Sequence, residues 1–180
     1  MFSGLIRVLA LVESVELLNN GVKLRLLLSS KLGLNVGSSL SCNGVCLTVV
    51  GVELQRVELE VWRDALCRTT LSALSRFDVL NVEPPVEVGA PLHGFVSTGR
   101  VSCVVKPVSA DAFGKAFDLK LSCPRWLVSR LSSKAGACLD GVALTLSSWG
   151  ERWLRTLVIG FTARTTSFKL GLVGRELNCC

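Results

Sequence analysis

The 180-residue sequence contains no tyrosine, one methionine and a single histidine, His93. It has no apolar run near the roughly 18 residues that a membrane-spanning helix needs. The first residues show no basic leader before an apolar core, so we expect no secretory signal and a cytoplasmic location. No Cys-x-x-Cys pair occurs, and one histidine does not complete a zinc site, so no metal is expected. The eight cysteines are predicted to be mostly small buried residues, whereas the adjacent pair Cys179 and Cys180 is predicted to be exposed.

Charge is also sparse, since charged residues make up 19% of the chain. The 20 lysines and arginines exceed the 14 acidic residues and give a net charge of +6, but they form no dense run. Scattered basic residues that alternate with apolar ones are typical of solvated sheet faces. An RNA-binding barrel would need cations and aromatic residues clustered on one sheet, so nucleic acid is not the expected partner.

What the sequence does contain is a repeated stretch. Residues 41–49 read Ser-Cys-Asn-Gly-Val-Cys-Leu-Thr-Val, and residues 138–146 read Cys-Leu-Asp-Gly-Val-Ala-Leu-Thr-Leu. Asn-Gly and Asp-Gly favour tight hairpin turns, and the Val/Leu/Thr run that follows favours a half-buried strand. Both copies therefore predict a turn that leads into a short strand.

Two further landmarks recur in the same order, and they predict an internal duplication. Arg-Thr-Thr occurs at 68–70 and at 164–166, which places Thr69 and Thr165 96 residues apart. Asn81 and Asn178 are 97 residues apart, as are Asn43 and Asp140. The duplication predicts two units, residues 1–86 and 87–180, with Pro84-Pro85 as a stiff break between them.

Alternating apolar and polar residues predict short strands in both units, for example at 22–26 and 57–61 in the first. The second unit repeats this order at 117–121 and 153–159, and its start at 92–96 is matched with residues 2–6. Short helical segments are expected at 29–34, 64–74 and 124–131. Many short strands with little helix predict an all-β fold of two tandem antiparallel barrels.

Met1-Phe2-Ser3-Gly4-Leu5-Ile6, the two turn-strand motifs and the paired Arg-Thr-Thr segments together resemble riboflavin synthase of the lumazine-binding, alpha-chain type. The resemblance runs through both halves and implies two six-stranded Greek-key barrels. It implies the dismutation of two 6,7-dimethyl-8-ribityllumazine molecules to riboflavin and 5-amino-6-ribitylaminouracil, without metal or organic cofactor. It also implies a homotrimer with the reacting pair between subunits, and lumazine synthase as a candidate partner. A duplicated domain suits this reaction, because holding two like rings together can supply about 7–11 kcal/mol of the barrier.

The resemblance also implies the site residues. In the N-terminal pocket they are Gly4, Leu5, Ile6, Cys46, Leu47, Thr48, Glu60, Val61, Trp62, Arg63, Asp64, Ala65, Gly94, Phe95 and Val96. In the C-terminal pocket they are Ala143, Leu144, Thr145, Thr156, Leu157, Val158, Ile159, Gly160 and Phe161, with Lys134 reaching across a subunit boundary. The catalytic assignment is Cys46, supported by Ser39, Phe2 and Ser3.

Plainer interpretations exist for several of these residues. A cysteine within an apolar strand is more often a core residue than a nucleophile, and only the surrounding motif favours catalysis by Cys46. Thr48 and Thr145 are also ordinary strand residues, and Phe2 is also an ordinary core anchor. Thr69 and Thr165 are expected to cap turns by side-chain hydrogen bonds.

The chain departs from the family pattern at identifiable places. Ala90 and Phe95 stand where the family has histidines, and Ala143 replaces the serine of the second motif. The family's Pro-Glu/His-Thr-Leu turn is replaced in both halves, at residues 63–66 and 159–162. The family's acidic residue just beyond Cys180 and its C-terminal helix have no counterpart, which is expected to weaken the trimer. Two hypotheses therefore stay open: a pared-down riboflavin synthase, and a non-catalytic lumazine- or flavin-binding protein of the same fold.

Overall fold

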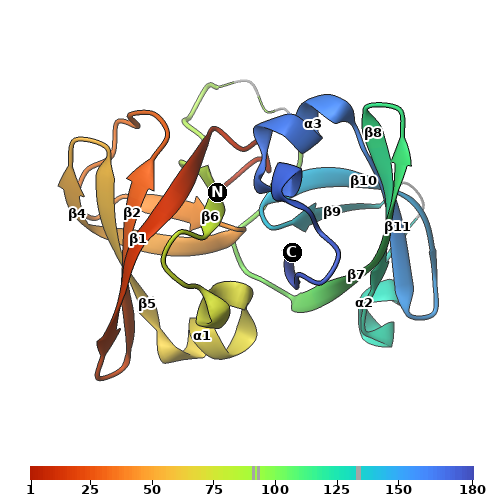
Figure 1. The fold of residues 1–180 in the computed structure, drawn as a ribbon, viewed down its shortest axis with the longest axis horizontal. Coiled ribbons are helices and arrows are strands. Elements are labelled where there is room, and N and C mark those ends of the chain that lie inside the picture. Colours follow the sequence, from red (N-terminus) through yellow and green to blue (C-terminus); the bar gives the residue numbers. More distant parts are fainter. Residues whose placement is uncertain (91, 93, 133–134) are drawn as a thin grey trace.

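The computed structural model describes residues 1–90, 92, 94–132 and 135–180. Within them the chain forms two closed antiparallel barrels, one after the other in sequence (Figure 1). Around the first barrel the strands follow the order β1-β2-β5-β4-β3-β6, and β6 pairs back with β1. Their bounds are β1 (Val8–Leu18), β2 (Gly21–Leu28), β3 (Ser39–Cys42), β4 (Val45–Glu53), β5 (Arg56–Trp62) and β6 (Val79–Glu83).

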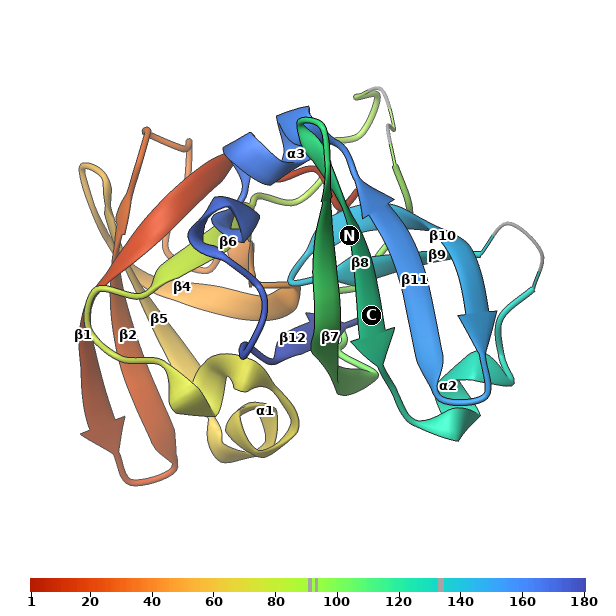
Figure 2. The same ribbon diagram turned by 45° about the vertical axis from the view of Figure 1, so that its right-hand side comes forward.

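The second barrel has the order β10-β11-β8-β7-β12-β9, and β9 closes it against β10 (Figure 2). Its strands are β7 (Cys103–Phe113), β8 (Ala116–Ser122), β9 (Gly136–Leu139), β10 (Val142–Gly150), β11 (Trp153–Val158) and β12 (Leu177–Cys179). The predicted all-β fold of two six-stranded barrels is confirmed. The barrel strands fall within residues 1–86 and 87–180, although the domain boundary itself stays a prediction.

Short helices connect some of the strands. They are α1 (Arg63–Arg68) and the 3-10 helix η1 (Thr70–Ala73) in the first half, and α2 (Arg125–Val128), α3 (Gly160–Thr165) and the 3-10 helix η2 (Ser167–Leu170) in the second. Helices α1 and η1 correspond to α3 and η2, and among the described residues α2 occurs in the second half alone. The helical segments expected within 64–74 and 124–131 are therefore present. None of the helices in the described ranges is long and apolar enough to cross a membrane.

Each barrel has its own core, built by the alternation that the sequence displays. Side chains of a strand point alternately to its two faces. In β2 the inward positions Val22, Leu24, Leu26 and Leu28 are buried, and Lys23 and Arg25 between them point outward. In the second barrel the largest fully buried side chains are Leu119, Leu121, Leu139, Leu154 and Leu177.

Two local expectations are wrong. Residues 29–34 form no helix. Leu32 and Leu34 both pack against the core, and the Leu34 amide donates to the Leu32 carbonyl at 2.8 Å, which closes a tight turn at Gly33 instead. Cys179 is not exposed, since it lies within β12 as part of the second core at 1% exposure, and Cys180 is half-buried. The short strand β12 needs inward residues to complete the barrel, and Cys179 is one of them.

The two repeated turns meet back to back between the barrels. Asn43 and Asp140 have φ of 46° and 44°, and the glycines that follow have φ of 80° and 78°, as the predicted tight turns require. A Cβ placed on Gly44 would lie 2.9 Å from the backbone nitrogen of Gly141, and a Cβ on Gly141 would lie 2.9 Å from that of Gly44. Only glycine permits this mutual approach.

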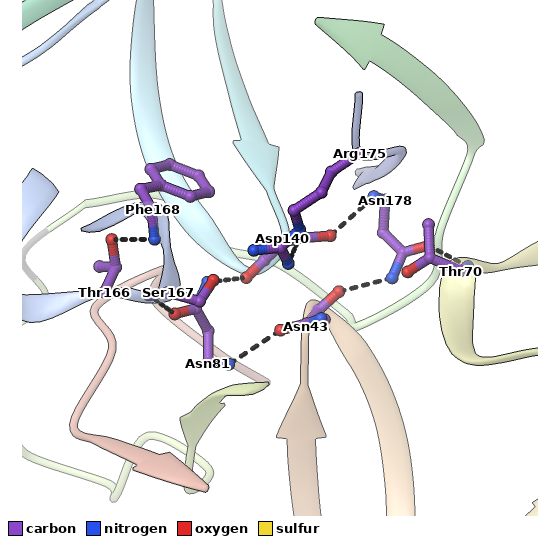
Figure 3. A network of polar contacts seen from close by, with 9 residues as sticks. All are labelled: Asn43, Thr70, Asn81, Asp140, Thr166, Ser167, Phe168, Arg175 and Asn178. Atoms are coloured by element: carbon purple, nitrogen blue, oxygen red, sulfur yellow. Dashed lines mark hydrogen bonds and ion pairs between the residues drawn. The ribbon is translucent and has the colours of Figure 1, made fainter. Parts of the chain in front are cut away.

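A reciprocal network of buried side chains surrounds this contact (Figure 3). Asn81 Nδ2 donates to the carbonyl of Asp140 at 3.0 Å, and Asn178 Nδ2 donates to the carbonyl of Asn43 at 2.9 Å. The backbone amides of Asn81 and Asn178 donate in turn to the side chains of Asn43 and Asp140, each at 2.8 Å. Each asparagine thus ties its own barrel's turn to the turn of the other barrel.

The Oδ1 atoms of the same asparagines hold the segments that follow the short helices. Asn178 accepts from the Thr70 amide at 2.9 Å, and Asn81 accepts from the Ser167 amide at 2.7 Å. The counterpart of Thr69 is therefore Thr166, at the same 97-residue offset, and the match with Thr165 is wrong by one position. Thr69 and Thr166 both cap their 3-10 helix by accepting from the amide two residues on, so the predicted role is confirmed for Thr69.

Asp140 breaks the symmetry of this network because its counterpart is the neutral Asn43. Its Oδ1 accepts from Asn178, but its Oδ2 has no hydrogen bond and lies 3.6 Å from Arg175 Nη2. Burial raises the pKa of the Asp140 carboxyl to about 7, although the Asn178 amide and Arg175 oppose the shift. The charged carboxylate is therefore held in the folded chain at a cost.

Replacing Asn81 by alanine should destabilise the whole chain. The substitution leaves the Ser167 amide and the Asp140 carbonyl without partners in a buried place, which typically costs about 1–3 kcal/mol for each group. We expect a lower urea midpoint for Asn81→Ala, and no change for the exposed Asn35→Ala. If the two variants unfold at the same urea concentration, the network does not hold the barrels together.

The raised pKa of Asp140 predicts a pH-dependent stability. The pKa of Asp140 is about 7 in the folded chain and 3.8 in the unfolded chain. The free energy of unfolding is therefore highest, as far as this group is concerned, below about pH 4, and it falls as the pH rises from about 4 to about 7. Asp140→Asn should flatten this slope and raise the free energy of unfolding above pH 7 by roughly 1–3 kcal/mol. Urea unfolding between pH 5 and 8 measures it, with the exposed Asp111→Asn as control. Equal slopes in Asp140→Asn and the unsubstituted chain would contradict the assignment.

Candidate functional site

The outer face of the first barrel carries a row of polar side chains across four neighbouring strands. On β4, Thr48 is paired with Ser39 of β3 on one side and with Glu60 of β5 on the other. Glu60 is paired in turn with Lys23 of β2. Paired side chains on one sheet face stand about 4.5–5.5 Å apart, so the row forms one continuous polar surface.

Cys46 lies on the same face, two residues before Thr48, and it is exposed. Other cysteines of the motifs differ in this respect. Burial raises the pKa of the Cys42 thiol to about 12 and that of the Cys138 thiol to about 11, which keeps both protonated in the core. Since a thiol reacts as its thiolate and must be reached by its substrate, Cys46 is the better-placed of the three for chemistry.

The segment between the barrels runs beside Cys46. The Cys46 amide donates to the carbonyl of Gly99 at 2.9 Å, and a Cβ on Gly99 would lie 2.6 Å from the Cys46 Cβ and 3.0 Å from the ring of Phe2. Gly99 therefore forms one wall of the face next to the exposed thiol.

The same contact recurs in the second barrel with residues from the start of the chain. The Ala143 amide donates to the carbonyl of Gly4 at 2.9 Å, and a Cβ on Gly4 would lie 2.5 Å from that of Ala143. Ile6 packs against the second core. The structure thus places Gly4 and Ile6 beside the second barrel, whereas the prediction groups Gly4, Leu5 and Ile6 with Cys46 in one ligand pocket.

Gly99 is a site residue that sequence reasoning missed. Gly4 and Gly99 each stand four residues before the first strand of a barrel, at Val8 and Cys103. This shared spacing was the available signal, and the match of residues 2–6 with 92–96 is wrong by five positions. The new match also leaves His93, which lies outside the described residues, without a role in the repeat.

Glu83 anchors the start of the chain. Glu83 is 3% exposed, and its carboxylate accepts from the Ser3 amide at 2.7 Å, the Ser3 hydroxyl at 2.7 Å and the Gly4 amide at 3.0 Å. Ser3 and Phe2 are both buried, so their side chains hold this segment in place. The position equivalent to Glu83 in the second barrel is Cys180, whose thiol lies 3.6 Å from the carbonyl of Gly44.

The second barrel presents an equivalent face with different chemistry. Position by position, Gly136 stands for Ser39, Ala143 for Cys46, Thr145 for Thr48, Leu157 for Glu60 and Ile159 for Trp62. Leu157 is 44% exposed, Ile159 56% and Phe161 69%. The row on the first face offers a thiol, hydroxyls, the Glu60 carboxylate and Lys23. The matching row on the second face offers the Thr145 hydroxyl among apolar side chains and, in the place of Lys23, Asp118, which forms an ion pair with Arg155.

The remaining predicted site residues divide by the direction of their side chains. Exposed or half-buried side chains belong to Trp62, Arg63, Asp64, Ala65, Phe95, Val96 and Leu5, and the backbones of Gly94 and Gly160 are accessible. Side chains that point into the barrel cores, and can reach an outer face only by their backbone, belong to Leu47, Val61, Leu144, Thr156 and Val158. Lys134 lies outside the described residues.

The hollows of the surface do not coincide with the exposed thiol. A depression of about 270 Å³ lies beside Glu60 and Trp62, at one end of the first face. A larger groove of about 490 Å³ lies between the barrels near Asn43, Phe77 and Arg175, and neither Cys46 nor Thr48 lines it. Cys46 and Thr48 therefore stand on the outer side of the sheet, away from these two hollows. No group of three or more His, Cys, Asp or Glu side chains in the described residues is placed to hold a metal ion.

Comparisons with known proteins agree with this architecture. Residues 3–84, which span the first barrel, match the family described as the lumazine binding domain. The chain is 29% identical to the riboflavin synthase of Brucella abortus over 99% of its own length and 91% of that protein. It is 27% identical to the riboflavin synthase of Bacillus amyloliquefaciens over 99% of its length and 83% of that protein. The resemblance to riboflavin synthase is confirmed.

Solved structures show the same fold. LumP complexed with riboflavin superposes with a TM-score of 0.90 at 17% identity, over 100% of this chain and 98% of LumP. LumP complexed with 6,7-dimethyl-8-(1'-D-ribityl) lumazine superposes with a TM-score of 0.85 at 16% identity, also over 100% of this chain and 98% of that one. At this identity the likeness shows the two-barrel fold of this chain and no more.

Removing the charge of Glu83 should loosen the start of the chain. Glu83→Gln keeps the size of the side chain but replaces charge-assisted hydrogen bonds by weaker ones, so we expect a loss of about 1–3 kcal/mol of stability. The amides of Ser3 and Gly4 should exchange their hydrogens faster, which mass spectrometry measures directly. The exposed Glu87→Gln is the matched control. Unchanged exchange at Ser3 and Gly4 would rule out the anchoring role.

Proposed function

We propose that the chain is a riboflavin synthase. It binds 6,7-dimethyl-8-ribityllumazine and transfers a four-carbon unit from one molecule to another, which yields riboflavin and 5-amino-6-ribitylaminouracil. The observation that carries the proposal is the exposed Cys46 on a polar outer face whose equivalent recurs in the second barrel. The riboflavin synthases that match over nearly the whole chain support it.

The first face can supply what this reaction needs. Cys46 is the group that we assign to nucleophilic addition at the ring, since its thiol is exposed beside Gly99. Ser39, Thr48 and Glu60 offer hydrogen bonds to the ring edge and the ribityl hydroxyls. Phe2 and Ser3 act by position, because they hold the segments next to Cys46 and Ala143. The reaction joins two like molecules, so most of the barrier is lowered by holding them together.

The exposure of Cys46 on the outer side of the sheet is relevant to assembly. An outer sheet face buries a ring ligand fully only when another surface covers it, so we propose that the second ring is presented by the second barrel of another subunit in a trimer. Lumazine synthase, which would supply the substrate, is a candidate partner, and the cytoplasm is the proposed location.

A second function is favoured by the difference between the two faces. The second face has Ala143 and Leu157 where the first has Cys46 and Glu60, so the two faces offer a lumazine or flavin ring different groups. LumP, which has the same fold, is known in complexes with flavin mononucleotide, riboflavin and the lumazine. The alternative is therefore a non-catalytic protein that binds one such ring.

One assay separates these functions. The purified chain is incubated with 6,7-dimethyl-8-ribityllumazine, and riboflavin is followed by its absorbance and fluorescence. We expect Cys46→Ser to reduce the turnover number at least a hundredfold and to leave ligand binding within about threefold, because the hydroxyl is a far weaker nucleophile than a thiolate. Cys67→Ser, an exposed cysteine on α1, is the control.

Two outcomes would overturn the enzyme assignment. Full turnover by Cys46→Ser would remove Cys46 from the mechanism. Stoichiometric binding without any riboflavin formation by the unsubstituted chain would establish the binding protein instead.

A further inference from the structure

An aromatic side chain of the chain itself lies on the second face. The ring of Phe95 stands with its edge over the backbone of Gly136, so closely that a Cβ at position 136 would overlap the ring atoms Cζ, Cε1 and Cε2. Phe95 is half-buried in this position, although it belongs to the segment between the barrels. Gly136 is therefore a place where close approach by an aromatic ring requires the absence of a side chain.

The position of Gly136 makes this contact significant. Gly136 pairs with Thr145 as Ser39 pairs with Thr48, so the two residues are equivalent in the two barrels. On the first face, the row that contains Ser39 and Thr48 is the surface proposed to receive the ligand ring. On the second face, the Phe95 ring lies over the same point of the sheet.

Backbone hydrogen bonds hold Phe95 there. Its amide donates to the carbonyl of Ser3 at 3.0 Å, and Phe2 and Ser97 exchange two hydrogen bonds of 2.8 Å each. Ser3 is itself fixed by Glu83 through its amide and its hydroxyl. The ring thus belongs to an anchored segment.

The surroundings suit a phenyl ring. A ring laid on the first face would cover the hydroxyl of Ser39 and the thiol of Cys46, whereas the equivalent residues below Phe95 and Gly94 are Gly136 and Ala143. A glycine and an alanine leave no side-chain polar group to be desolvated. The second face therefore accepts an apolar ring without leaving these positions unsatisfied.

We propose that Phe95 occupies the second ring position, so that the folded chain holds one lumazine or flavin ring and accepts a second only when Phe95 is displaced. This inference rests on the proposed function, because it takes the first face as a ring-binding surface. In the proposed trimer, the second barrel can present a ring to another subunit only after Phe95 has moved aside. It makes Phe95 the residue that sets the number of ligands bound per chain.

Riboflavin binding by calorimetry and fluorescence quenching tests the proposal. The unsubstituted chain should bind one riboflavin per chain, and Phe95→Ala should bind two. Gly136→Ser, which restores the residue found at position 39 and leaves no room for the Phe95 ring, should also bind two. Phe77→Ala, which removes an exposed phenylalanine of the first barrel, should still bind one. Circular dichroism and thermal unfolding check that each variant is folded.

A further variant shows which face each ligand uses. Thr48→Trp fills the first face, so it should reduce binding from one to none in the unsubstituted chain and from two to one in Phe95→Ala. Two ligands bound to the unsubstituted chain, or a single one bound to folded Phe95→Ala and Gly136→Ser, would overturn the role of Phe95. If neither the chain nor Phe95→Ala binds riboflavin or the lumazine, the proposed function itself fails.

Discussion

The contact between the two glycine turns is the constraint on which the rest of the molecule depends. Gly44 and Gly141 approach so closely that neither admits a side chain, and the hydrogen bonds of Asn81 and Asn178 cross from each barrel to the turn of the other. Because every bond has a counterpart, the two barrels are fixed in a nearly symmetric relation. The strands that leave these turns, β4 and β10, carry Cys46 and Ala143, so the network also determines how the two candidate faces are placed.

A second exchange joins the barrels at the faces themselves. The start of the chain lies along the second barrel through Gly4 and Ala143, and the segment between the barrels lies along the first through Gly99 and Cys46. Each face is therefore completed by residues from outside its own strands. The backbone hydrogen bonds of Gly4 with Ala143 and of Gly99 with Cys46 are equivalent. The side chains beside them differ, since Glu83 fixes the start of the chain and Cys180 stands at the position equivalent to Glu83 in the other half.

Most of the fold could be predicted from local features of the sequence. The Asn-Gly and Asp-Gly turns, the alternating strands and the repeat all report on neighbouring residues, and the structure confirms the two barrels that they imply. The match of residues 2–6 with 92–96 failed because the true counterparts, Ser3-Gly4 and Thr98-Gly99, share little beyond a glycine four residues before a strand. The contact of Phe95 with Gly136 joins residues 41 positions apart and depends on how the segment between the barrels is anchored, so no pattern in the sequence indicates it.

If the ring of Phe95 occupies the second face, one physical argument explains why the two faces carry different side chains. A phenyl ring placed on a serine hydroxyl and a thiol would remove both from water without giving them partners, which typically costs about 1–3 kcal/mol for each group. Glycine at 136 and alanine at 143 avoid this cost and also provide the space that the ring of Phe95 fills. The first face keeps its serine, cysteine and glutamate, where Cys46 is exposed and Ser39 and Glu60 are half-buried. The polar groups thus remain where a ligand from solution can satisfy them, and they are missing where the chain provides its own apolar ring.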